Sequence, residues 1–171
     1  MTNTPVANTI LMSHYVSHLR DRSYMSGIER DRARVKATGE VFTPTKLVQE
    51  MLDKLSVEVW DDPTKTFIDP SCGDGQFLSE VLIPKLEQGH DFGQALSTIY
   101  GVDLMEDNVD LSRERLLCGN TNPDVIETVE RNIVCADALN YHYRFDGSRS
   151  KEVSVIKDFE WGKSSTTSRM R

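Results

Sequence analysis

The sequence predicts an α/β fold with a parallel sheet of three to four strands, flanked by helices and preceded by a helical extension. Short apolar segments at 66–69, 98–102 and 132–135 have the length and composition of buried strands. An aspartate ends or closely follows each segment, and helical sequence separates one segment from the next. Alternating strands and helices are typical of a parallel sheet, which binds ligands at the carboxyl ends of its strands.

The first 37 residues form the predicted helical extension. Apolar and basic residues recur there at roughly helical spacing, which favours one or two helices interrupted near Gly27. An amphipathic helix is then expected to open with Thr43 as N-cap and Pro44 as its first residue. Its apolar residues recur every three or four positions and are Leu47, Val48, Met51, Leu52 and Leu55.

Two further helices are expected between the strands. One begins at Gln76 and is disturbed but not ended by Pro84, and the other spans 106–117 before a polar break that ends at Pro123. Beyond Tyr143 the pattern weakens, although 153–156 has the composition of a fourth strand. We therefore expect three parts: the extension at 1–37, an α/β domain at 38–148 and a basic, flexible tail at 149–171.

Charge is unevenly distributed along the chain. The net charge of −7 divides into +3 for 1–37, +3 for 149–171 and −13 for 38–148. A core this acidic repels phosphates, so contact with DNA is expected only from the two ends or from a partner. Within the extension, the candidates for phosphate contact are Arg30, Arg32 and Arg34, although their alternation with acids is also typical of a solvated helix face.

Composition also limits location and metal binding. No apolar run approaches the ~20 residues that span a bilayer, and the first residues lack the pattern of a secretory signal. We expect a soluble, cytoplasmic protein without membrane contact. Cys72, Cys118 and Cys135 show no metal-ligand spacing, so they are interpreted as reduced thiols and no metal site is expected.

The loop after the first predicted strand contains two glycines. Gly73 and Gly75 allow the backbone to approach a ligand closely. The third glycine typical of dinucleotide sites is replaced by Leu78. A nicotinamide-dependent dehydrogenase is therefore the least favoured of the functions considered. Asp74 between the glycines would make the loop negative, and that favours a sulfonium or ammonium group over a pyrophosphate.

The aspartates at the strand ends suit an adenosine with a positive charge nearby. Asp103 is placed to accept two hydrogen bonds from ribose hydroxyls, and Asp137 to accept one from an exocyclic adenine amine. Any one of these acids, including Asp69, could instead be a helix cap or a turn residue. Three acids in the same position behind three strands favour the ligand site.

Four segments, in order, resemble successive motifs of the adenine-N6 DNA methyltransferase family. They are Thr38–Pro44 (TGEVFTP), Asp69–Phe77 (DPSCGDGQF), Gly101–Asp103 (GVD) and Ala136–Leu139 (ADAL), so that the resemblance covers about 38–140. It implies a Rossmann-like methyltransferase fold, a part in DNA methylation and restriction-modification, and S-adenosylmethionine as the cofactor.

The resemblance also assigns roles to residues. It implies that 42–44 closes over the methionine end of the cofactor, while Asp69 and the glycine loop hold its amino-acid portion. Asp103 would hold the ribose, and Asp137 the adenine. The expected cofactor-binding residues are Phe42, Thr43, Pro44, Asp69, Pro70, Cys72, Gly73, Gly75, Phe77, Asp103, Leu104, Asp137 and Ala138.

The chain differs from the family at the catalytic motif. Its members carry Asn/Asp-Pro-Pro-Tyr/Phe after the fourth strand, where the polar groups accept hydrogen bonds from the target amine and the ring stacks on the flipped base. No Pro-Pro pair occurs in these 171 residues. The catalytic residues are therefore unknown, and the nearest candidates are Asp158 and Phe159.

Three hypotheses follow. The first is the cofactor-binding half of an adenine-N6 DNA methyltransferase, completed by a partner chain, or by self-association, that covers the open sheet edge. The second is a non-catalytic protein that regulates or inhibits a methyltransferase or restriction complex. The third is a compact stand-alone methyltransferase that uses 158–161 as an irregular active-site segment.

The aromatic residues Tyr141, Tyr143 and Phe145 suit either stacking on a base or an interface.

Overall fold

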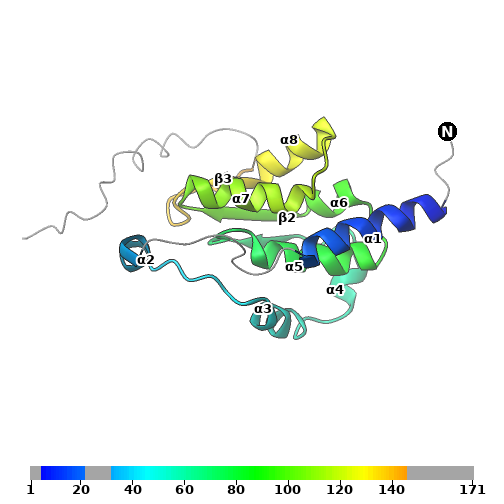
Figure 1. The fold of residues 1–171 in the computed structure, drawn as a ribbon, viewed down its shortest axis with the longest axis horizontal. Helices are drawn as coiled ribbons and strands as arrows, with labels where there is room; N and C mark the ends of the chain where they lie inside the picture. The colour runs from blue at the N-terminus through cyan, green and yellow to red at the C-terminus, as the bar shows by residue number, and fades with distance from the viewer. Residues whose placement is uncertain (1–4, 22–31, 146–171) are drawn as a thin grey trace, which may run out of the picture.

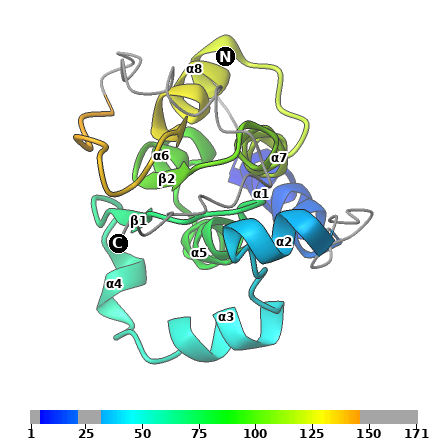
Figure 2. The same ribbon diagram turned by 90° about the vertical axis from the view of Figure 1, so that its left-hand side faces the viewer.

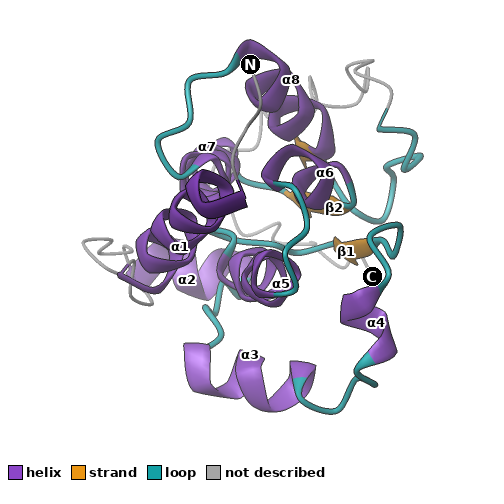
Figure 3. Cartoon of the chain, turned by 90° about the vertical axis from the view of Figure 1, so that its right-hand side faces the viewer, coloured by secondary structure: helices purple, strands orange, loops and turns teal. Residues whose placement is uncertain are grey.

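The computed structural model describes residues 5–21 and 32–145 (Figure 1). Helices cover a small central sheet in this part of the chain (Figure 3). The helices are α1 (Pro5–Asp21), α2 (Arg32–Thr38), α3 (Thr45–Leu52), α4 (Glu58–Asp61), α5 (Gln76–Glu87), α6 (Phe92–Ser97), α7 (Glu106–Leu117) and α8 (Pro123–Asn132). The strands are β1 (Phe67–Asp69), β2 (Ile99–Asp103) and β3 (Ile133–Cys135).

The sheet is parallel, as the alternation of strands and helices predicts. Its order is β1-β2-β3, with Asp69 opposite Gly101 and Asp103 opposite Cys135. The register brings the carboxyl ends of the three strands to one edge. This confirms the expected α/β architecture. The possible fourth strand at 153–156 lies outside the described residues.

Helix α5 forms the centre of the core. It buries Leu78, Val81 and Leu82, and helix α1 packs against it with Leu19 also buried. Each such side chain contributes about 1.5–3 kcal/mol through burial of apolar surface. The sheet lies close to α5 because β2 has a glycine there: a Cβ at Gly101 would lie 2.7 Å from Cδ1 of Leu78.

Helix α3 begins one residue later than predicted. The N–H groups of Leu47 and Val48 both donate to the carbonyl of Pro44, at 2.9 and 3.1 Å, so Pro44 is the N-cap and the prediction of Thr43 is wrong. Proline fixes its own φ, and this helps to set the chain's entry into the helix. Only Val48 and Leu52 of the expected apolar set are buried, while Leu47, Met51 and Leu55 stay about half exposed.

Helix α8 was not predicted. The side chain of Asn122 accepts a hydrogen bond from the N–H of Asp124 at 3.0 Å, and Pro123 occupies the first helical position. These are ordinary signals of a helix start. Their position in the polar break concealed them, although Val125 and Val129 follow at helical spacing. A further short helix, α6, begins at Phe92 between α5 and β2, with the side chain of Asp91 as its N-cap.

The face of the sheet away from α5 carries aromatic side chains. Neighbouring residues of a strand point to opposite faces, so Tyr100 lies across the sheet from Gly101. The ring of Phe145 packs on Tyr100 with 4.7 Å between centroids, and it also contacts Tyr141. Figure 2 shows this segment beside the strands, on the side away from α1 and α7. On β1, Ile68 remains 50% exposed.

None of the helices in the described ranges has both the length and the apolar content needed to span a bilayer.

Candidate cofactor site

The loop between β1 and α5 has the backbone that its glycines predict. Gly73 and Gly75 have φ values of +53° and +81°, in the region that side chains disfavour. Gly75 is the N-cap of α5, and its N–H donates to the carbonyl of Cys72 at 2.9 Å. A Cβ at Gly75 would lie 2.5 Å from Oγ of Ser112 on α7, so glycine is required there for packing as well.

Asp103 connects this loop to the end of β2. Its Oδ2 accepts a hydrogen bond from the N–H of Gly73 at 2.9 Å, while its Oδ1 accepts from the N–H of Met105 at 2.9 Å and from Nδ2 of Asn108 at 3.1 Å. The residue is only 8% exposed. The carboxylate is therefore held rigidly against the glycine loop.

All three predicted acids make the same turn at the end of their strand. In each case Oδ1 accepts a hydrogen bond from the N–H two residues later, at 2.9 Å: Asp69 from Ser71, Asp103 from Met105 and Asp137 from Leu139. The turn role that the sequence left open is thus present at every site. It leaves further lone pairs on each carboxylate, so it is compatible with ligand binding.

Two neighbouring carboxylates make this edge of the sheet negative. Burial raises the pKa of Asp69, the hydrogen bond from the N–H of Ser71 opposes that rise, and the charge of Asp103 adds to it. A bound cation would relieve the repulsion between the two acids. The site therefore favours a positively charged ligand.

Asp74 does not supply that negative charge, contrary to the expectation from sequence. Its Oδ2 lies 2.6 Å from Nη2 of Arg115, and both side chains are buried. Arg115 is 41 positions away in the sequence, on α7, so sequence spacing could not reveal the pair. Asp69 and Asp103 carry the argument for a cationic ligand instead.

The segment before α3 lies across the glycine loop. Phe42 is buried, and a Cβ at Gly73 would lie 3.2 Å from Cε1 of its ring. Thr43 is half-buried and Pro44 is exposed. The ring of Phe42 therefore lies against the glycine loop, while the closure of 42–44 over the methionine end of the cofactor stays a prediction.

The remaining predicted site residues differ in where they lie. Cys72 is buried, and Phe77 is partly buried and packs against the core. Pro70 and Leu104 are exposed near the strand ends. Asp137 and Ala138 follow β3, where the N–H of Ala136 donates to the carbonyl of Asp103 at 2.9 Å. Asp158 and Phe159 lie outside the described residues.

Three buried polar residues of α7 were not predicted to belong to the site. Asn108, Ser112 and Arg115 are buried at spacings of four and three, beside the apolar residues of the same helix. That spacing places them on one face of a helix. Charged and polar residues on the inward face of the predicted helix were the sequence feature that could have indicated the site. In the structure they lie where α7 contacts the glycine loop.

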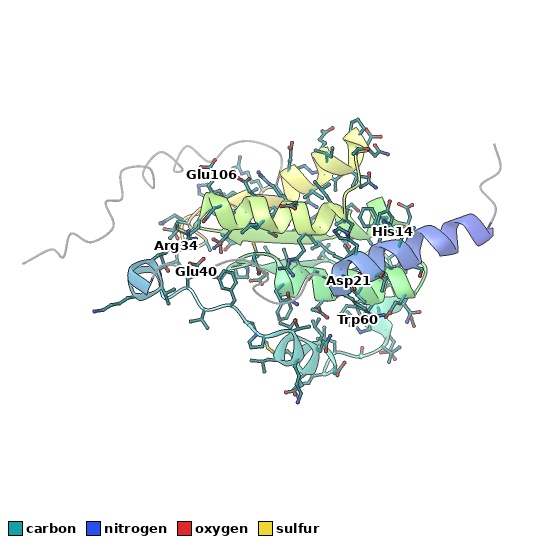
Figure 4. All side chains as sticks on the ribbon, in the orientation of Figure 1. His14, Asp21, Arg34, Glu40, Trp60 and Glu106 are labelled. Atoms are coloured by element: carbon teal, nitrogen blue, oxygen red, sulfur yellow. The ribbon has the colours of Figure 1, made fainter. Side chains whose placement is uncertain are left out.

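Arg34 of the extension is engaged within the fold. Its guanidinium pairs with Glu40 and with Asp107. Asp107 lies in the first turn of α7, and Glu40 accepts a hydrogen bond from Asn108 of the same helix. Figure 4 shows Arg34 and Glu40 at the end of the molecule where Glu106 begins α7. Arg34 therefore serves an internal role, and the described side chains test neither Arg30 nor Arg32.

Comparison with known proteins agrees with this geometry. The family model for N-6 DNA methylases matches residues 29–161, which is more than half of the chain. The chain belongs to the N-6 DNA methylase family. Its three-stranded parallel sheet and flanking helices are the corresponding part of a Rossmann-like methyltransferase fold, and membership connects the chain to DNA methylation and restriction-modification.

A relative among curated proteins is the Type II methyltransferase M.VspI of Vibrio sp. (strain 343). The two are 31% identical over 127 residues, which cover 73% of this chain and 26% of M.VspI. The chain thus spans about a quarter of the length of this relative. No solved structure matches the chain.

Family membership implies S-adenosylmethionine as the methyl donor. Burial raises the pKa of the Cys72 thiol, and the charges of Asp103 and Asp69 raise it further, so this cysteine is a poor nucleophile. In the described residues, no group of three or more His, Cys, Asp or Glu side chains is arranged to hold a metal ion.

Proposed function

We propose that this chain is the S-adenosylmethionine-binding part of an adenine-N6 DNA methyltransferase. The observation that carries the proposal is the hydrogen bond of 2.9 Å from the N–H of Gly73 to Asp103, which joins the glycine loop to the acid at the end of β2. Family membership supplies the reaction class. When bound, S-adenosylmethionine supplies an electrophilic methyl group on a sulfonium.

The chain's own groups fit such a ligand. The glycine loop offers backbone donors and space, and Phe42 covers Gly73. Asp69 and Asp103 together offset the positive charge of a sulfonium or ammonium group. Asp137 and Ala138 lie on the segment held beside Asp103, where an adenine would reach them.

The ribose contact is proposed to be a single hydrogen bond. A carboxylate has roughly four lone-pair positions. Asp103 already accepts three hydrogen bonds from Gly73, Met105 and Asn108. One hydroxyl can therefore bind without displacing a protein donor, whereas the two bonds that the sequence suggested would require one protein bond to break.

Catalysis and base recognition are proposed to need a second polypeptide that carries the Asn/Asp-Pro-Pro-aromatic motif. Among the described strands, β1 pairs only with β2, so its other edge is free to receive a strand. An apolar stripe of α3 and the turn that follows it, made of Leu47, Met51 and Leu55, is about half exposed. Figure 3 shows α3 and α4 on the side where β1 ends the sheet.

We define the free edge of β1 and this apolar stripe as the docking face. A partner strand beside β1 would bury Ile68, and its neighbouring elements would cover the stripe. A second copy of this chain is the competing occupant. Sedimentation of Met51→Glu against Val41→Glu, an exposed residue outside the docking face, separates these cases: a dimer lost only in Met51→Glu would indicate self-association.

The proposed function is tested by transfer of a radiolabelled methyl group from S-adenosylmethionine to unmethylated DNA. The chain alone is expected to bind the cofactor and transfer nothing, and transfer should appear with a polypeptide that supplies the missing motif. Methylation by the chain alone would contradict the need for a partner. Loss of that activity in Asp158→Ala, with cofactor binding intact, would establish the stand-alone alternative.

The alternative of a regulatory protein predicts a different result. A non-catalytic member would bind the cofactor or a methyltransferase subunit and would never support methyl transfer in any pairing.

Contact with DNA is proposed through the basic ends or the partner, because the net charge of 38–148 is −13. A DNA substrate and cysteines present as thiols suit a cytoplasmic location.

A further inference from the structure

Asn108 lies between two carboxylates at the start of α7. Its Nδ2 donates to Oε1 of Glu40 at 2.6 Å and to Oδ1 of Asp103 at 3.1 Å. The side chain is 1% exposed. A primary amide has two N–H donors on one nitrogen, so a single asparagine can connect two acids that would otherwise repel each other.

Glu40 is held from its other side by Arg34. The guanidinium donates from Nε to Oε2 of Glu40 at 2.9 Å and from Nη2 to Oε1 at 3.1 Å, and it also binds both oxygens of Asp107. Bidentate pairs of this kind fix orientation as well as distance. The two carboxylates raise the pKa of Arg34, so it stays charged. In Figure 4 its label adjoins that of Glu40.

These contacts form a continuous path from α2 to the glycine loop. The path runs from Arg34 through Glu40 and Asn108 to Asp103, whose other oxygen accepts from the N–H of Gly73. Each step is a hydrogen bond between groups with little freedom to rotate. The orientation of the Asp103 carboxylate therefore depends, through Glu40 and Asn108, on Arg34 of the extension.

We infer that Arg34, Glu40 and Asn108 are positioning residues that aim Asp103 at a ribose hydroxyl and so give the site its preference for a ribonucleoside. The inference rests on the proposed function. Without the amide of Asn108, Oδ1 of Asp103 keeps only the local bond from Met105, and the carboxylate must be ordered when the ligand binds. The extension thus contributes to recognition without touching the ligand.

A matched pair of asparagines tests this role. Asn132 is also 1% exposed, and its Nδ2 donates to the carbonyls of Leu96 and Ile99, at the other end of β2. Asn108→Leu and Asn132→Leu each remove a buried amide, so both should destabilise the fold. Only Asn108→Leu should alter ligand recognition.

The measurement is calorimetric titration of the full chain with S-adenosylhomocysteine and with its 2′-deoxy and 3′-deoxy analogues. The unaltered chain should bind the ribonucleoside more tightly than at least one deoxy analogue. Asn108→Leu should reduce that ratio by roughly three- to tenfold, the worth of about one hydrogen bond. Asn132→Leu should keep the ratio, because a general loss of structure weakens all three ligands alike.

Glu40→Leu is the second variant, since Glu40 lies between α2 and α3 and is not one of the buried apolar residues of the core. It should lower the same ratio, and it provides the test if Asn108→Leu does not fold. An unchanged ratio in the folded variants, or a ribonucleoside bound no better than its deoxy analogues by the unaltered chain, would overturn the inference alone. Failure of the unaltered chain to bind S-adenosylhomocysteine would overturn the proposed function, and the inference with it.

Discussion

Asp74 and Arg115 form a buried ion pair, with 2.6 Å between Oδ2 of the acid and Nη2 of the guanidinium. Nη1 of the same arginine donates to Oε1 of Gln76 at 2.7 Å, and the Gln76 amide donates to Oγ1 of Thr45 at 3.0 Å. The pair therefore joins the glycine loop to three helices, α3, α5 and α7. Its role in the fold is to hold the loop in place.

Arg115→Met should strongly destabilise the chain, because it leaves the Asp74 carboxylate buried without its cation. Breaking a buried ion pair from one side costs about 3–5 kcal/mol in the free energy of unfolding. Urea denaturation measures this change. The double variant Asp74→Asn/Arg115→Met should lose less than Arg115→Met alone, and a single variant as stable as the unaltered chain would refute the structural role.

Gly75→Ala should destabilise the chain more than Gly119→Ala. Both glycines have positive φ, +81° and +72°, so alanine costs roughly 1–2 kcal/mol at either position. At Gly75 a Cβ would also lie 3.0 Å from the Cα of Ser112, whereas at Gly119 nothing lies within 4 Å. Thermal unfolding of the two variants should separate these costs, and equal losses would show that the contact with Ser112 is unimportant.

Asp69→Asn should stabilise the ligand-free chain at neutral pH. Burial raises the pKa of Asp69 in the folded chain, so its favourable contribution is full below the unfolded pKa and is lost as the pH rises through the folded pKa. The gain from asparagine should therefore shrink as the pH falls into the acid range. Urea denaturation at several pH values measures it, while the same variant should bind S-adenosylmethionine more weakly.

Asp62 provides the control of opposite sign. Hydrogen bonds from Thr64 lower the pKa of this exposed acid, so its contribution is present above the unfolded pKa and is lost as the pH falls through the folded pKa. Asp62→Asn should lose stability at neutral pH and match the unaltered chain in acid. If both variants responded to pH in the same direction, burial would not be the cause at Asp69.

Cys135 should react slowly with iodoacetamide in the folded chain. Partial burial and the carboxylates of Glu106 and Asp103 raise the pKa of this thiol to about 11, and thiolate is the reactive form. In urea at the same mildly alkaline pH, labelling should be much faster. Mass spectrometry of the labelled peptides distinguishes the cysteines, and rapid reaction of Cys135 in the folded chain would contradict the described environment.

Local patterns in the sequence were sufficient for much of the fold. Helix α7 begins and ends where its apolar spacing predicts, and the strands that end near Asp69, Asp103 and Asp137 are present. Helix α8 was missed because its start lies in a polar break, although Asn122 and Pro123 were valid signals.

The errors at the site have a different cause, because they involve partners far apart in the chain. Asp74 is neutralised by Arg115, 41 positions away, and Asn108 bridges to Glu40 across 68 positions. Neither contact can be predicted from the periodicity of the sequence. The apolar residues of α3 also gave no sign of which face would be buried, so the exposure of Met51 emerged only from the structure.

The most direct test of the account is calorimetric titration of the chain with S-adenosylmethionine, with NAD as the control ligand and Asp103→Ala as the altered site. We expect saturable binding of S-adenosylmethionine at one site per chain, no binding of NAD, and loss of binding in Asp103→Ala while the variant stays folded. Binding that survives in Asp103→Ala, or no binding by the unaltered chain, would contradict it.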